Sequence, residues 1–523
     1  MQSVFLGQQE QAFIPLPGAC LRFRQLGSKL YKSTSLGQVM TMWCKRLFLP
    51  GAATLIVLLA GCGGSNKNPT PQGGFTNANL NGTYAMSFSG VDANGFFAVA
   101  GSITADGNGH ITSGQLDVNE APSPVNATLT GTYNIRADGR GVAGLVTSAG
   151  NFSLVFVIVG DNRALLTRFE QSATGSGSLD LVNSSAFSTP ALAGTFVFNL
   201  NGIDTAGNSF ATVGAITTDS SGNITSGVQD ESDNGNIFPN ETIGGGSLQV
   251  SGNGRGTALL NTAAGPLNFA LYVVDANPIK LVETDSLPAL AGDAFRQSGT
   301  ISNASLSGPF AFTVAGNDVT VGPFAAGAVF DADGAGNITS GTEDLNDAGS
   351  ATPNAPISGT YALDASGRGT LSLTNATVGT LTFAIYPTLN GVQMLDTNGS
   401  LVVSGAAFPQ TGALSNATVQ GTYGMNYTAA SASGELDVVA SVNANGTGRL
   451  TAIQDISNPG AGPPSGGTAI TGDYAVDATG HGPLTLQSFL GQQNMAIYVL
   501  NGSRALFVEM DTDIVAAGAI EHQ

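Results

Sequence analysis

The sequence predicts an all-β protein made of four tandem antiparallel domains. The first observation is composition: 72 of the 523 residues are glycine and only 10% are charged, as expected for short strands joined by tight turns. The second is an internal repeat along most of the chain. The third is an alternation of large apolar with small polar residues inside each repeat, which is the period of a β-strand.

The repeat is marked by a Gly-Thr-Tyr-like triplet that recurs at steps of 112, 114 and 113 residues. The four triplets begin at Gly82, Gly194, Gly308 and Gly421. A second triplet-like site follows in the middle of each repeat. Self-similarity at a fixed period indicates complete structural units in series. We expect four β domains, over residues 80–185, 192–297, 306–410 and 419–523.

Side chains at the start of each repeat alternate with a period of two. Tyr84, Met86 and Phe88 are separated by small residues, so the large side chains lie on one face of a strand. A later strand in each repeat is apolar on both faces, and we expect it to be the most enclosed one. These doubly apolar stretches are 152–159, 267–274, 381–386 and 495–500.

Turn signals divide the first repeat into eight strands. We expect them at 83–91, 96–105, 110–118, 127–136, 141–147, 151–159, 163–170 and 175–182. Eight strands joined by hairpins can close into a small up-and-down barrel, which leaves no exposed edge. In topology such a domain resembles the lipocalin and streptavidin type of barrel. An immunoglobulin-like sandwich is the alternative, because the missing Cys and Trp pair argues only against antibody-type domains.

A short apolar run with a basic flank precedes the repeats. Lys45 and Arg46 lead into residues 47–59, and the run closes on Leu59-Ala60-Gly61-Cys62. This pattern is typical of a secretory signal and is shorter than the ~20 apolar residues of a membrane span. The last four residues resemble the lipobox of bacterial lipoproteins. The resemblance implies diacylglycerol on Cys62 and cleavage before it; an ordinary cleaved signal with a chance cysteine is the alternative.

The position of this signal divides the N-terminal part of the chain. Signals begin near a true N-terminus, so we expect residues 1–39 to be a non-native leader, with a long natural basic leader as the alternative. Residues 40–61 would be the signal peptide. Residues 62–79, rich in Gly, Asn, Pro and Ser, would be a lipidated tether. In lipoproteins an Asp after the cysteine favours inner-membrane retention; Gly63 stands there, so the resemblance implies the outer membrane.

Charge and cysteine usage limit the function of residues 62–523. This part carries 11 Lys and Arg against 35 Asp and Glu, a net charge of −24, so we expect no nucleic-acid partner. We interpret the acids as a solvated acidic surface. The other two cysteines, Cys20 and Cys44, precede the predicted cleavage site, which leaves none for a disulfide or a Cys metal site.

Two acidic patterns have spacings that could form a metal or catalytic site. Residues 331–337 have the alternating carboxylates and glycine of a calcium loop, but we prefer a hairpin turn because residue 342 is threonine where an EF-hand has glutamate. Glu283 and Asp285 lie two residues apart, a spacing that could serve acid–base chemistry. The pair is matched in the fourth repeat but not in the others, so we interpret it as a solvated or turn-bracing face.

Three arginines stand between glycines at matching positions, and the fourth repeat has His481 there. They are Arg140, Arg255 and Arg368. A structural role, in capping a turn or pairing with an internal acid, is preferred to binding a carboxylate or sugar acid. An aspartate recurs after Ser-Gly in the first three repeats, and the fourth repeat has an aspartate slightly earlier. We interpret it as bracing a loop; the residues are Asp117, Asp230, Asp344 and Asp455. No histidine has a partner at metal-ligand spacing, so a metal site stays unassigned and no cofactor is expected.

These patterns predict a non-enzymatic, lipid-anchored protein of the cell envelope. We expect display, adhesion or scaffolding through four repeated domains, with the membrane and a surface partner such as a glycan as its contacts. The alternative is carriage of small apolar ligands inside the barrels. A polysaccharide-active enzyme is the least favoured interpretation, because no catalytic constellation recurs in the repeats.

Overall fold

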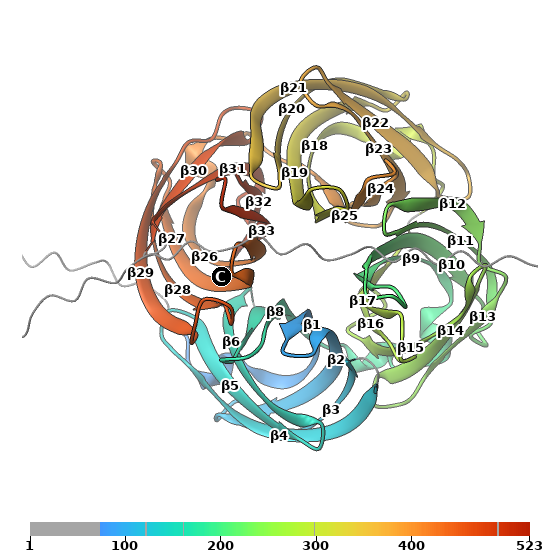
Figure 1. Ribbon diagram of the computed structural model, residues 1–523. Helices are drawn as coiled ribbons and strands as arrows, with labels where there is room; N and C mark the ends of the chain where they lie inside the picture. Colours follow the sequence, from blue (N-terminus) through green and yellow to red (C-terminus); the bar gives the residue numbers. More distant parts are fainter. Residues whose placement is uncertain (1–73, 121–122, 161, 298, 489–490) are drawn as a thin grey trace, which may run out of the picture. The chain divides into compact units, whose positions relative to one another are not determined.

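The computed structural model describes residues 74–120, 123–160, 162–297, 299–488 and 491–523, all within one compact unit, Lys67–Gln523. These residues form four all-β domains in tandem, which can be followed by colour along the chain in Figure 1. Among these residues no helix is long and apolar enough to cross a membrane. The predicted leader, signal peptide, lipidation site and most of the tether lie outside the described residues.

The first domain is a closed antiparallel barrel in which each strand pairs with the next and β8 returns to β1. Its strands are β1 (Asn81–Asp92), β2 (Gly95–Asp106), β3 (His110–Glu120), β4 (Val125–Ile135), β5 (Arg140–Thr147), β6 (Gly150–Val159), β7 (Arg163–Phe169) and β8 (Thr174–Leu181). Each lies within two residues of its predicted bounds. The predicted up-and-down barrel is confirmed, and the sandwich alternative is wrong.

The second domain has the same meander, but its fourth strand is broken into two, which gives a nine-stranded sheet. Its strands are β9 (Gly194–Ile203), β10 (Ser209–Thr218), β11 (Ile224–Asp233), β12 (Asn236–Thr242), β13 (Gly246–Val250), β14 (Arg255–Thr262), β15 (Gly265–Val273), β16 (Ile279–Glu283) and β17 (Ala289–Arg296). The break falls at the consecutive glycines 244–246. Hydrogen bonds from Leu248 N to Gly222 O (2.7 Å) and from Ile243 N to Gly227 O (3.0 Å) bring the two ends of the sheet together.

The third and fourth domains are again closed eight-stranded barrels. The third contains β18 (Ser307–Asp318), β19 (Gly322–Asp333), β20 (Asn337–Asp347), β21 (Ser350–Leu363), β22 (Gly369–Asn375), β23 (Gly379–Pro387), β24 (Val392–Asp396) and β25 (Leu401–Pro409). The fourth contains β26 (Gln420–Ser431), β27 (Gly434–Asn445), β28 (Arg449–Ser457), β29 (Ser465–Tyr474), β30 (His481–Ser488), β31 (Gly491–Asn501), β32 (Arg504–Glu509) and β33 (Ile514–His522).

Short 3₁₀ helices lead into the barrels: η1 (Asn77–Asn79), η2 (Ser184–Ala186), η3 (Thr189–Leu192), η4 (Asn303–Ser305) and η5 (Asn416–Thr418). In three repeats a buried tyrosine of the mid-repeat triplet fixes this entry segment, because its hydroxyl donates to the carbonyl oxygen of the residue that follows the helix. The bonds are Tyr133 to Leu80 (2.6 Å), Tyr361 to Leu306 (2.7 Å) and Tyr474 to Val419 (2.7 Å).

The large apolar side chains predicted to share one strand face fill the barrel interiors. In the third barrel the Phe312 ring packs against Phe330 and Phe383 at centroid distances of 6.1 and 6.0 Å. The doubly apolar strands β6, β15, β23 and β31 are buried over most of their length. They are not the most enclosed strands as predicted, because the shorter strands β16, β24 and β32 that follow are buried at nearly every residue. Because their interior faces belong to the barrel cores, their outward faces must be covered by something else.

A glycine in the last strand of each repeat allows the barrel to close tightly on its first strand. At Gly405 in β25, an added Cβ would lie 2.1 Å from the carbonyl oxygen of Thr313 in β18. Gly177, Gly292 and Gly518 occupy the matching positions, each opposite a large interior side chain. The small residue leaves room for the neighbouring strand to approach.

We predict that Gly405→Ala lowers the free energy of unfolding by about 1–3 kcal/mol, because the methyl group collides with backbone that cannot rotate away. Urea denaturation measures the effect. Gly144→Ala in β5 is the matched control: its Cβ would meet nothing within 4 Å, and the change should be neutral or slightly stabilising. Equal stability of the two variants would contradict the role of the seam glycine.

Candidate functional site

The covered outward faces belong to contacts between barrels. The second strand of each repeat contacts the last strand of the following repeat: β2 with β17, β10 with β25, β19 with β33, and β27 with β8. The fourth contact joins the last repeat to the first. The contacts therefore form a closed cycle of four, and each uses one surface of one barrel and a different surface of the next.

Each contact has an apolar centre. Between the first two barrels, Ala98 and Ala100 of β2 share a buried cluster with Tyr272 of β15. Tyr386 and Tyr498 occupy the same place at the next two contacts, against small residues of the preceding barrel. At the fourth contact the position of the tyrosine is held by Val157, which packs with Val439. Small side chains on one barrel thus accommodate the large ones of the next.

A contact between a buried aspartate and a basic side chain accompanies every apolar contact, and the sequence-predicted arginines supply three of the four bases. The pairs are Arg255 with Asp117 (2.8 Å), Arg368 with Asp230 (2.6 Å), His481 with Asp344 (2.7 Å) and Arg140 with Asp455 (2.8 Å). The acid lies on the third strand of one repeat, and the base stands at the start of the fifth strand of the next. The recurring aspartates and the recurring bases therefore meet across repeats.

The tyrosines reinforce these pairs. Tyr272 donates its hydroxyl hydrogen to Asp117 (2.6 Å), and Tyr498 donates to Asp344 (2.8 Å). Burial, followed by the adjacent carboxylate, raises the pKa of both hydroxyls, so they remain protonated donors. Each of these carboxylates thus contacts a basic side chain and a phenol of the next barrel. The sequence contained no signal for the tyrosines beyond their place in the doubly apolar strand.

The contact that closes the cycle differs in detail. Arg140 is the most buried of the three arginines, and its guanidinium is shared between Asp455 and Asp138 of its own barrel (3.0 Å). Both oxygens of Asp455 accept from one guanidinium nitrogen. In place of a tyrosine hydroxyl, Asp455 accepts from the backbone nitrogen of Gly467 in its own barrel (2.7 Å).

A second set of buried polar contacts lies beside the first. Asn119 of β3 donates to the backbone carbonyl of Glu283 (2.9 Å) in the next barrel, and Asn346 of β20 donates to that of Glu509 (2.9 Å). Both glutamates are fully buried, and burial followed by a hydrogen bond with the nearby aspartate raises the pKa of each to about 9. Their side chains are therefore neutral acids at pH 7.

This geometry corrects two interpretations of the sequence. Fourteen Asp and Glu side chains of the described residues are buried, so the acids do not simply form a solvated surface. Glu283 and Glu509 are not solvated, although their partners do brace turns: Asp285 accepts from Asn268 N at 3.0 Å and Asp511 from Asn494 N at 2.9 Å. Their burial reflects the interface, which the sequence of a single repeat does not show.

The loop at 331–337 is the predicted hairpin turn. The carboxylate of Asp333 accepts from the backbone nitrogens of Ala335 (2.7 Å) and Asn337 (2.9 Å). Hydrogen bonds from the Asn337 side chain and then from these nitrogens lower the pKa of Asp333 to about 2. Among the described residues no group of three or more His, Cys, Asp or Glu side chains is placed to hold a metal ion.

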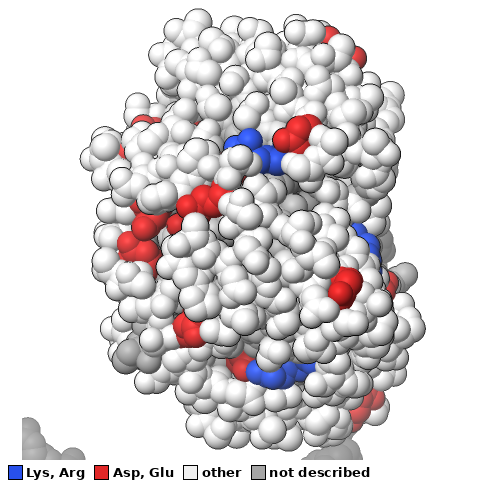
Figure 2. All heavy atoms as spheres, turned by 90° about the vertical axis from the view of Figure 1, so that its right-hand side faces the viewer, with Lys and Arg blue, Asp and Glu red and all other residues white. Residues whose placement is uncertain are grey.

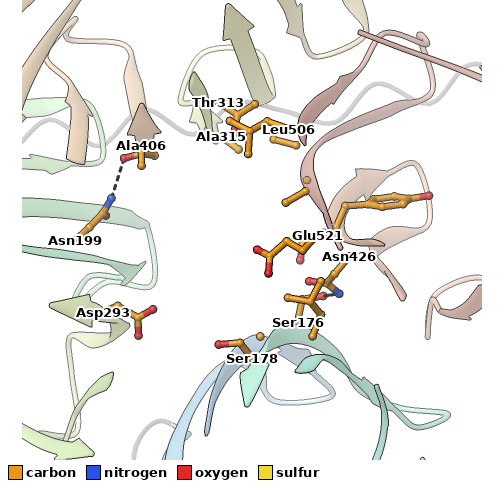
Figure 3. Close-up of a pocket in the computed structure, with 18 of the residues that line it drawn as sticks. Ser176, Ser178, Asn199, Asp293, Thr313, Ala315, Ala406, Asn426, Leu506 and Glu521 are labelled. Carbon is orange, nitrogen blue, oxygen red and sulfur yellow. Dashed lines mark hydrogen bonds between the residues drawn. The ribbon is translucent and has the colours of Figure 1, made fainter. Parts of the chain in front are cut away.

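The four barrels also surround an open cavity of about 490 Å³, lined by their first and last strands and, in three repeats, by the penultimate strand. In Figure 3 the labelled side chains come from all four repeats and surround one open space. The outward residue at the same position of each first strand faces it: Ser87, Asn199, Thr313 and Asn426. The sequence pattern had assigned these side chains only to the small polar face of their strands.

Charged groups of three repeats lie at this cavity as a continuous chain of ion pairs. Glu521 lies 3.6 Å from Arg504 and 3.2 Å from Arg163, and Arg163 lies 2.8 Å from Asp180. Lys280, fully buried, connects Asp180 (2.8 Å) to Asp293 (3.8 Å). Although burial acts to raise it, the pKa of Asp180 falls to about 2 because of Lys280 and Arg163. Three cations and three acids alternate, so the chain has no net charge.

Comparison with known proteins assigns neither a family nor a function to this chain. No protein-family model matches the chain, and the search of curated proteins found no significant match. Two solved structures of the vaccine antigen transferrin binding protein B from Haemophilus parasuis Hp5, a single and a double mutant, are similar at 9% and 10% identity. They cover 71% and 62% of this chain and 85% and 75% of theirs, with TM-scores of 0.19 and 0.17. At these values the likeness carries no argument about function.

We predict that Glu283→Gln weakens the pH dependence of stability. Unfolded glutamate has a pKa near 4.5, whereas Glu283 in the folded chain has a pKa of about 9. Between these values only the folded state holds the proton. This group therefore lowers the free energy of unfolding of wild type by about 1.4 kcal/mol for each unit by which pH rises. A neutral amide removes that loss. The free energy of unfolding of the variant should therefore increase relative to that of wild type as pH rises from 5 to 8.

Urea denaturation at several pH values measures this difference. Asp473→Asn, at an aspartate whose side chain is 67% exposed, serves as the control and should keep the wild-type slope. Parallel pH profiles for Glu283→Gln and wild type would show that the carboxyl is ionised in the folded protein.

Proposed function

We propose that this chain is a lipid-anchored protein of the bacterial cell envelope whose four barrels form a rigid, non-catalytic display platform. The observation that carries the proposal is the closed cycle of contacts between aspartates and basic side chains, in which Arg140 of the first repeat meets Asp455 of the fourth. Barrels on flexible linkers would move independently. Barrels held at four contacts present a fixed arrangement of loops, which suits multivalent recognition of a repetitive partner.

The anchor is proposed on the sequence alone. Leu59-Ala60-Gly61-Cys62 resembles a lipobox, and acylation of Cys62 with more than one chain would give stable membrane attachment. Gly63 after the cysteine favours the outer membrane within that resemblance. Residues 62–79 would then connect the lipid to the first barrel.

Carriage of apolar ligands inside the barrels is less well supported. The cavity described within the first barrel, beside Met86 and Phe156, measures about 20 Å³. A single water needs roughly 10–15 Å³ by this measure, and small-molecule pockets span about 300–1,000 Å³. Side chains such as Phe312 and Tyr427 occupy the interiors of other barrels. The interiors support the fold, which leaves the outer surface and the central cavity for recognition.

The outer surface suits recognition through hydrogen bonds more than through charge. On the face shown in Figure 2, acidic and basic side chains are scattered among uncharged ones. Eight large apolar side chains among the described residues are well exposed, and only one of them, Phe238, is aromatic. A neutral polar partner such as a glycan fits this surface better than a nucleic acid, whose phosphates need clusters of basic groups.

We predict that Cys62→Ser releases the protein from the membrane. Without the thiol no diacylglycerol can be attached, so the protein should move from the membrane to the soluble fraction and lose metabolic labelling with an alkyne fatty acid. Cys44→Ser, upstream of the predicted cleavage site, is the matched control and should stay labelled and membrane-bound. Unchanged fractionation of Cys62→Ser would reject the lipid anchor.

We predict that Asp455→Ala opens the cycle between the fourth and first barrels. Loss of one partner of a buried pair costs about 3–5 kcal/mol, which should lower the unfolding free energy. Small-angle X-ray scattering should show a larger radius of gyration. Asp473→Ala removes an exposed pair with Arg449 and should change neither. An unchanged radius for Asp455→Ala would show that this pair does not hold the platform together.

A further inference from the structure

We infer that the central cavity between the four barrels is a binding site for a short neutral saccharide. This deepens the proposed display function by giving the cavity a ligand class, and it rests on the closed cycle of barrels. The site exists only where all four repeats meet, because its lining comes from the first and last strands of each and from the penultimate strands of three.

The lining is rich in hydroxyl and amide groups, which both donate and accept hydrogen bonds. Nine such side chains line the cavity: Ser87, Ser176, Ser178, Asn199, Thr313, Gln393, Ser404, Asn426 and Thr428. Sugar hydroxyls have the same dual capacity, so many orientations of donor and acceptor can be matched. The volume of about 490 Å³ lies within the range of small-molecule sites.

The charges at the cavity argue for a neutral ligand. Each lining cation, Arg163 or Arg504, already has Glu521 within 3.6 Å, and Asp293 has Lys280 at 3.8 Å. A charged ligand would compete with pairs that exist, whereas a neutral hydroxyl can bind beside them. The ion-pair chain then serves to keep the walls in place.

Several lining side chains are held in place by polar contacts. The Asn199 amide donates to Gln393 Oε1 (3.1 Å) and Gly405 O (3.2 Å) of the next repeat. Arg163 Nε and Arg504 Nε lie at Glu521, and Asp293 Oδ1 lies at Lys280. The polar wall of the cavity is therefore fixed before a ligand binds.

Small residues separate these polar groups. Ala406, Ala517 and Ala519 line the cavity together with glycines of the last strands, and Phe408 adds apolar surface. Flat patches of this kind can contact the C–H faces of a sugar ring while the polar groups bind its hydroxyls. The lining thus offers both surfaces that a pyranose presents.

Saturation-transfer NMR tests the inference on the full chain, purified in a detergent without a sugar head group. The probes are four neutral disaccharides: maltose, cellobiose, trehalose and N,N′-diacetylchitobiose. We expect transfer to at least one of them. Ala406→Trp, which fills the cavity, should weaken that binding at least tenfold, and Thr313→Val, which removes one hydroxyl, at least threefold.

Matched controls lie in the same repeat. Ala376→Trp and Thr374→Val change exposed residues of the β22–β23 hairpin and should bind as wild type does. Wild-type binding by Ala406→Trp would place the sugar elsewhere and overturn the inference.

Scattering on the same samples separates the two proposals. A wild-type chain that keeps its compact radius but shows no transfer to any of the four probes would overturn the saccharide site and leave the display platform standing. A wild-type chain whose barrels are apart in solution would overturn both.

Discussion

A carboxylate on the third strand of each repeat meets an arginine or histidine at the fifth strand of the next, and the arrangement of the four barrels depends on this contact. The apolar faces around it are alanines and valines against tyrosine, surfaces that by themselves permit sliding. A bidentate pair such as Arg255 with Asp117 has one geometry. Burial makes a mispaired contact costly, because it would leave a charge without a partner in a dry interface. The polar contacts thus specify the register in which the apolar surfaces of neighbouring barrels pack against each other.

The same contacts explain why so many acids are buried in a protein with few bases. Each aspartate of the ion pairs uses its oxygens for a neighbouring base and for backbone or side-chain donors of its own barrel, as Asp230 does with Arg368 and with Asn240 N (3.0 Å). The buried glutamates beside them have no cation as a partner. Burial therefore raises the pKa of each carboxyl, and the side chains stay neutral. Two solutions to carboxylate burial, pairing and protonation, therefore lie side by side at one interface.

The barrel could be predicted from the sequence because its determinants are local: a period of two, hairpin turns and the spacing of the triplets. The interfaces could not. A base at the position of Arg255 and an aspartate near the position of Asp117 each occur once per repeat. Pairing within a repeat and pairing with the neighbouring repeat therefore give the same pattern along the chain. Tyr272 reads as an ordinary core residue in a doubly apolar strand. The cavity residues, such as Asn199 and Thr313, alternate like solvent-facing positions, and only the cycle of barrels turns that face inward.

The head-to-tail use of two different surfaces has a consequence for the number of barrels. Each barrel contacts the next, and the fourth returns to the first. Adding a fifth repeat would require the contact between the fourth and first barrels to open, while deleting one would leave its two neighbours without their usual partner. The number of domains in this chain is therefore coupled to the closure of the cycle.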